Sequence, residues 1–101
     1  MFILPNNNGP PYFVDALQDY EFTVPDEGLF KLPAIVDPDG DSYSVKVTLG
    51  KASTLLQWKK SYFKIKTNSN MVGTFTINIT LTDENETPLS SQFIFKITIK
   101  P

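Results

Sequence analysis

Hydrophobic and polar residues alternate with a period of two along most of the chain. The longest example covers residues 73–83, and the last residues of the chain repeat the pattern. A β-strand with one face in a core and one face in solvent produces this alternation. The inward positions predicted in this way are Tyr43, Val45, Val47 and Leu49; Phe63 and Ile65; Phe75, Ile77, Ile79 and Leu81; and Phe93, Phe95, Ile97 and Ile99.

The first part of the chain is less regular but also predicts strands. One inward set is Tyr20, Phe22 and Val24, and another is Phe30, Leu32, Ala34 and Val36. Pro33 interrupts the second set and predicts an edge or a bulge, because proline lacks the backbone N–H of a sheet ladder. Short strands are also expected within residues 12–17 and 55–58. Turn-forming residues separate the strands, and no helical period is present, so the chain is predicted to be an all-β sandwich or barrel.

Composition excludes several kinds of chemistry. The 101 residues contain no cysteine and no histidine, so disulfides, thiolate catalysis and histidine-based general bases are absent. The net charge is −2, unlike the basic footprint of a nucleic-acid-binding domain. No apolar run approaches the roughly 20 residues that cross a bilayer. We therefore expect no catalysis, no nucleic-acid partner and no direct membrane insertion.

The stretch Ala34–Val47, AIVDPDGDSYSVKV, resembles the Asp-x-Asp loop of cadherin repeats, and most closely that of the dystroglycan-type cadherin-like and putative-Ig family. Other segments follow that family in order and spacing: NNNGPPYF, YEFTVPDEGLF and the closing MVGTFTINITLTDENETPLSSQFIFKITI. The resemblance implies a seven-strand Greek-key immunoglobulin/cadherin-like β-sandwich over residues 11–101. It also implies that residues 1–10 are a linker from a preceding domain.

The family's fold implies a calcium site at the N-terminal end of the domain. Asp37, Asp39, Asp41 and Asp83 would converge near Asn6–Asn8, while Glu27 and the turn at Asn68–Asn70 would lie at the opposite end. Calcium is bound by roughly six to eight oxygen atoms, which such residues offer. A second interpretation stays open, since Asp-Pro-Asp-Gly is also a strong β-turn sequence without any metal. KIKTNSNMVG lacks the acidic triplet of adhesive cadherins, which favours the dystroglycan-type relatives.

Two functions follow from these observations. The first is a non-catalytic structural or adhesion repeat of a larger extracellular or cell-surface protein, with neighbouring domains of its own chain, another protein or a glycan as partners. Calcium is the candidate cofactor. The alternative is a carbohydrate-binding accessory module of a secreted enzyme.

Three further features allow more than one interpretation. Asn78 and Asn85 each begin an N-glycosylation sequon, with Asn85 in a predicted turn. Trp58, Tyr62 and Phe63 form either a sugar-binding platform or part of the core. The basic residues of this region form either a binding face or a solvated strand surface that guards a sheet edge; they are Lys59, Lys60, Lys64 and Lys66.

Overall fold

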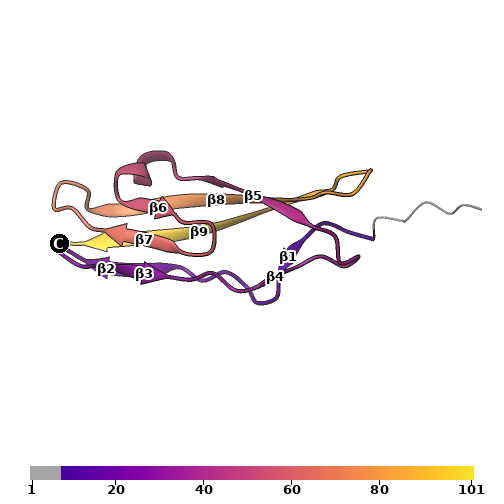
Figure 1. The fold of residues 1–101 in the computed structure, drawn as a ribbon. Coiled ribbons are helices and arrows are strands. Elements are labelled where there is room, and N and C mark those ends of the chain that lie inside the picture. The colour runs from indigo at the N-terminus through magenta and orange to yellow at the C-terminus, as the bar shows by residue number, and fades with distance from the viewer. Residues whose placement is uncertain (1–7) are drawn as a thin grey trace, which may run out of the picture.

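The computed structural model describes residues 8–101, which form two facing β-sheets (Figure 1). The larger sheet has the order β2-β9-β8-β5, with β2 at Tyr20–Thr23, β9 at Ser90–Lys100, β8 at Gly73–Asp83 and β5 at Tyr43–Thr48. The smaller sheet has the order β3-β7-β6, with β3 at Glu27–Phe30, β7 at Phe63–Lys66 and β6 at Leu56–Trp58. A short ladder joins β1 (Tyr12–Phe13) to β4 (Ile35–Val36).

The nine labelled segments amount to seven strands, because the first two strands are each divided. β1 pairs with β4, whereas β2 moves to the larger sheet and pairs with β9 in parallel. β3 pairs with β7, and its continuation after a break is β4. The remaining pairs are antiparallel, and the chain passes repeatedly between the sheets. The predicted seven-strand Greek-key sandwich is therefore confirmed.

The strands with clear alternation lie where the sequence predicts them. β8 has the predicted bounds, and its side chains alternate between buried and solvent-facing positions. The prediction of inward positions is wrong at the start of β5, where Tyr43 is 38% exposed, and again between β3 and β4. Ala34 and Val36 were expected to face inward, but both are exposed, and Ile35 packs against the core instead. The irregular segment around Pro33 shifts the alternation by one residue, since proline cannot donate to a ladder.

The core fills the space between the two sheets. Ile77, Ile79 and Leu81 of β8 and Phe95, Ile97 and Ile99 of β9 are almost fully buried. Phe63 stands at the centre of an aromatic group, with its ring centroid 5.1 Å from that of Phe30 and 4.7 Å from that of Trp58. Of the two interpretations of Trp58, Tyr62 and Phe63, the core interpretation is confirmed for Phe63, which has no exposed area, while Trp58 and Tyr62 are half-buried.

One short helical turn occurs where only a turn was predicted. The 3-10 helix η1 (Gly50–Thr54) connects β5 to β6 and buries Ala52. Within residues 8–101, no helix has the length and apolar character needed to cross a membrane.

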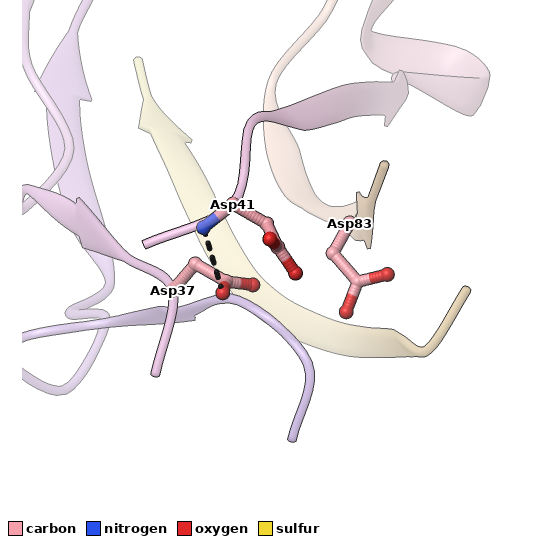
Figure 2. A group of neighbouring side chains, drawn as sticks. All are labelled: Asp37, Asp41 and Asp83. Atoms are coloured by element: carbon pink, nitrogen blue, oxygen red, sulfur yellow. Dashed lines mark hydrogen bonds between the residues drawn. The ribbon is translucent and has the colours of Figure 1, made fainter. Parts of the chain in front are cut away.

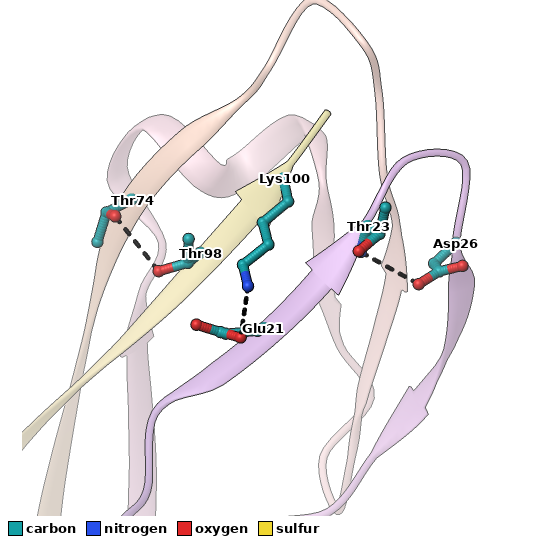
Figure 3. A network of polar contacts seen from close by, with 6 residues as sticks. All are labelled: Glu21, Thr23, Asp26, Thr74, Thr98 and Lys100. Carbon is teal, nitrogen blue, oxygen red and sulfur yellow. Dashed lines mark hydrogen bonds and ion pairs between the residues drawn. The ribbon is translucent and has the colours of Figure 1, made fainter.

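The chain enters and leaves the sandwich at opposite ends. The residues that precede β1 and those that follow β4 lie at one end, and β9 terminates at the other (Figure 1). Figure 3 shows the exit end, where the ammonium of Lys100 lies 3.0 Å from the carboxylate of Glu21 and the Thr23 N–H donates to Asp26. The Lys100–Glu21 pair is exposed, so it contributes at most about 1 kcal/mol. The aspartates of the predicted calcium site lie at the entry end.

Candidate metal centre

The sequence Asp37-Pro38-Asp39-Gly40 folds as a β-turn. The Gly40 N–H donates to the Asp37 carbonyl oxygen at 3.0 Å, and Gly40 has a φ of +70°, which glycine adopts without steric cost. The Asp37 side chain turns back into the loop, where its Oδ1 accepts the N–H groups of Asp39 at 2.9 Å and Asp41 at 3.1 Å. Turn chemistry therefore fixes the Asp37 carboxylate in place.

Asp83 enters the same region from the end of β8. It pairs with Tyr43 of β5 and is 2% exposed. Its Oδ1 accepts the N–H of Leu89 at 3.1 Å, and the N–H of Asn85 lies 3.4 Å from the same oxygen. The loop that follows β8 is thus folded around this carboxylate, which holds it toward the Asp37 turn.

The structure brings Asp37, Asp41 and Asp83 together into what we call the acidic cluster (Figure 2). Each contributes a carboxylate oxygen, and these oxygens all lie within 4.8 Å of one another. Asp37 is 8% exposed, and its Oδ2 is buried without a hydrogen-bond partner among the described residues. A buried carboxylate oxygen without a partner, placed beside two more carboxylates, is costly unless positive charge balances it. The cluster therefore has the charge and geometry of a cation site.

Asp39 does not join the acidic cluster, although the sequence placed it in the calcium site. Its Oδ2 accepts the N–H of Asn8 at 2.8 Å, and its Oδ1 accepts the Asn8 Nδ2–H at 2.6 Å. Asp39 instead fastens the incoming chain to the turn. Asn6 and Asn7, which were expected nearby, lie outside the described residues, as does most of the predicted linker at residues 1–10.

Asn85 is a site residue that sequence analysis missed. Its Nδ2–H donates to Asp41 Oδ2 at 3.0 Å, while its Oδ1 accepts the Thr87 N–H at 3.0 Å. The sequence singled out Asn85 only as the start of a sequon. Its position two residues after Asp83 was the available signal, because Asn and Asp side chains commonly bond to backbone two residues along.

The donor atoms of the acidic cluster suit a hard cation. All are carboxylate oxygens, and the chain has neither the cysteine nor the histidine that zinc and copper prefer. Three carboxylates supply only part of the roughly six to eight oxygens around calcium. Asn8 shows that the incoming chain lies beside the turn, so that chain and water are the nearby sources of further oxygens.

The other sequon, Asn78-Ile79-Thr80, lies within a central strand. Asn78 pairs with Thr48 of β5 on one side and with Ile94 of β9 on the other. Its Oδ1 is buried without a partner among the described residues. Asn85 lies on a loop, but its amide nitrogen is bonded to Asp41.

Comparisons with known proteins support the fold class. No protein-family profile and no curated protein matches the chain. Among solved structures, repeats EC21–23 of human CDH23 match 96% of the chain at 17% identity with a TM-score of 0.67. The extracellular domain of protocadherin GammaB4 matches 94% at 18% identity with a TM-score of 0.56. An endo-fucoidan hydrolase of glycoside hydrolase family 107 matches 91% at 15% identity with a TM-score of 0.65.

These likenesses place the chain among cadherin-like β-sandwich domains by fold. The chain spans 35% of the CDH23 fragment, 17% of the protocadherin and 14% of the hydrolase. The same sandwich therefore occurs as one part of much longer chains with different activities.

Proposed function

We propose that this chain is a non-catalytic structural or adhesion repeat of a larger extracellular surface protein, of the dystroglycan-type cadherin-like kind. Its task is to space or present neighbouring domains. The arrangement of the ends supports this proposal, since the chain enters at one end of the sandwich and leaves at the other (Figure 1). The absence of histidine and cysteine from the sequence supports a role without catalysis.

Calcium at the acidic cluster is part of the proposal. The observation that carries it is the buried, unpartnered Oδ2 of Asp37 beside the carboxylates of Asp41 and Asp83. Calcium bound there would neutralise the cluster and tie the Asp37 turn to the end of β8. Because Asp39 holds Asn8 on the same turn, the ion would also steady the entering chain.

Thermal unfolding in calcium and in chelator tests the proposal. Extracellular calcium modules bind with dissociation constants of about 10⁻⁴–10⁻³ M. At ten times the dissociation constant, binding adds about 1.4 kcal/mol to the free energy of unfolding. This corresponds to a rise in melting temperature of about 5 °C or more for a domain of this size.

Two variants localise the effect. Asp83→Asn removes a charge from the acidic cluster and is expected to abolish the calcium-dependent rise. Asp39→Asn removes the same charge from a residue outside the cluster and is expected to retain the rise. Wild-type protein that melts at one temperature with millimolar calcium and with chelator would refute the calcium proposal.

A carbohydrate-binding accessory module is the second candidate. The likeness to one part of an endo-fucoidan hydrolase favours it. A hollow of about 340 Å³ between β4, β5 and the β6–β7 turn adds to it, since Phe13, Tyr43 and Trp58 contribute to its lining. Binding of neutral oligosaccharides in a glycan array, lost in Tyr43→Ala and Trp58→Ala, would favour this candidate over the spacer.

A further inference from the structure

The charges of this chain are unevenly distributed along the sequence. Residues 42–82 contain six of the nine lysines and none of the eleven acidic residues. The rest of the chain carries three lysines and all eleven acids, which gives a net charge of −8 against +6 for the central segment. A near-neutral total therefore conceals a strongly basic portion.

The structure places part of this positive charge on the outer face of the smaller sheet. Lys64 and Lys66 alternate with buried Phe63 and Ile65 on β7, the middle strand, so their side chains point to solvent. Residues at positions i and i+2 of one strand, such as these two lysines, are about 7 Å apart. Neither lysine is in an ion pair within residues 8–101, where the one recorded ion pair is Lys100–Glu21.

Lys64 and Lys66 stand between two hollows, and together these form what we call the lysine groove. One hollow, of about 180 Å³, is bordered by Ser53 and Thr54 of η1, by Leu55 between η1 and β6, and by Gln57 of β6. The other, of about 330 Å³, is bordered by Glu27, Gly28 and Leu29 of β3. Leu29 lies opposite Lys64, and Glu27 lies opposite Lys66. Both lysines line both hollows.

We propose that the lysine groove binds an anionic polysaccharide that carries sulfate or carboxylate groups. Two unpaired ammonium groups on one strand complement anionic groups repeated along an extended chain. The hydroxyls of Ser53 and Thr54 and the amide of Gln57 are hydrogen-bonding groups suited to sugar hydroxyls. None of the described residues that line the two hollows is aromatic, so the bases of a nucleic acid have no ring to stack on.

This groove is separate from the acidic cluster. Glu27 of β3 lies opposite Lys66 of β7 in the ladder, and the Thr67 N–H donates to the carbonyl of Asp26, which places β7 near the exit end of the sandwich. The acidic cluster lies at the entry end. Binding at the lysine groove is therefore a property separate from the proposed calcium-stabilised spacer, and it can be tested independently of calcium binding.

Binding to polymers with one backbone tests the proposal. Dextran sulfate, carboxymethyl-dextran and neutral dextran are compared at low and moderate salt by calorimetry, with single-stranded oligothymidylate as a further probe. We expect binding to one or both anionic dextrans, weakened by salt, and none to neutral dextran. Equal binding to neutral dextran would overturn the proposal, as would tighter binding to oligothymidylate or absence of binding to every polymer.

Variants with matched charge locate the site. Lys64→Gln combined with Lys66→Gln is expected to weaken binding roughly tenfold, because both ammonium groups of the groove are lost. Lys46→Gln combined with Lys96→Gln removes the same charge from the larger sheet, and binding should change less than about twofold. Glu27→Gln, which removes the one carboxylate bordering the groove, should strengthen binding. Equal losses in the two double variants would refute a site at the groove.

Discussion

At the scale of single residues, Asp37 at the entry end both shapes the turn and adds its carboxylate charge to the acidic cluster. Asp37 uses Oδ1 to accept two backbone N–H groups and leaves Oδ2 buried without a partner among residues 8–101. The two interpretations of the Asp-Pro-Asp-Gly sequence are therefore compatible. The turn bonds hold one oxygen, and this same constraint keeps the other oxygen facing Asp41 and Asp83.

Asn85 is expected to compete with a cation for Asp41. Its Nδ2–H donates to Asp41 Oδ2, and a hydrogen bond to a charged group contributes about 1.5–3 kcal/mol, less when it is partly exposed. We expect Asn85→Ala to lower the melting temperature in chelator by about 5 °C. The difference between calcium and chelator should widen, because the competing donor is gone.

The control for Asn85 is Asn68→Ala at the opposite end. Asn68 Oδ1 accepts the Asn70 N–H at 2.8 Å, so this variant loses a similar turn bond without touching the acidic cluster. Its calcium-dependent shift should equal that of the wild type. A smaller difference in melting temperature between calcium and chelator in Asn85→Ala than in the wild type would show instead that the Asn85 side chain is a ligand of the ion.

At the scale of secondary-structure elements, hydrophobic alternation predicted the strands where both neighbours in the sheet are regular. β8 and β9 are long, and each buries one face against the core, so their period of two is clear. The prediction failed across Pro33, because the chain between β3 and β4 leaves the ladder and re-enters one residue out of phase. A period of two carries no information across such a break.

The candidate site was predicted in part, for a related reason. Asp37, Asp41 and Asp83 each adjoin a strand or a tight turn, so the fold expected from the resemblance was enough to bring them together. The partners of Asp39 and Asn85 depend on how irregular segments fold back, at Asn8 and at residues 84–89. Spacing along the sequence does not determine such long-range contacts.

The aromatic group around Phe63 joins the two sheets. Phe63 packs on Phe30 of the same sheet and lies edge-on to Phe95 of the other, at 5.9 Å between ring centroids. We expect Phe63→Leu to lower the free energy of unfolding by about 1–2 kcal/mol, part of the cost of a full aromatic truncation. Leu29→Ala, at a residue 64% exposed, should change it by less than about 0.5 kcal/mol. Urea unfolding measures both, and equal effects would contradict this assignment of the core.

At the scale of the whole molecule, charge and chain direction divide the sandwich into distinct regions. The entry end carries the acidic cluster and the anchored Asn8, and the outer face of the smaller sheet carries the lysine groove. The exit end terminates β9 at Lys100. Copies joined head to tail would place the acidic cluster of every copy after the first at a junction between domains, where a cation would act on the joint.

A head-to-tail fusion of two copies tests this consequence. The junction of the fusion would consist of residues 1–10 of the second copy, next to the acidic cluster of that copy. Small-angle X-ray scattering is expected to show a longer and narrower distribution of interatomic distances in calcium than in chelator. Asp83→Asn in the second copy should abolish the difference, whereas the same change in the first copy should preserve it, because only the second copy's cluster lies at the junction. Identical scattering in calcium and chelator, from protein whose melting temperature does rise with calcium, would show that the ion stabilises the domain without stiffening the joint.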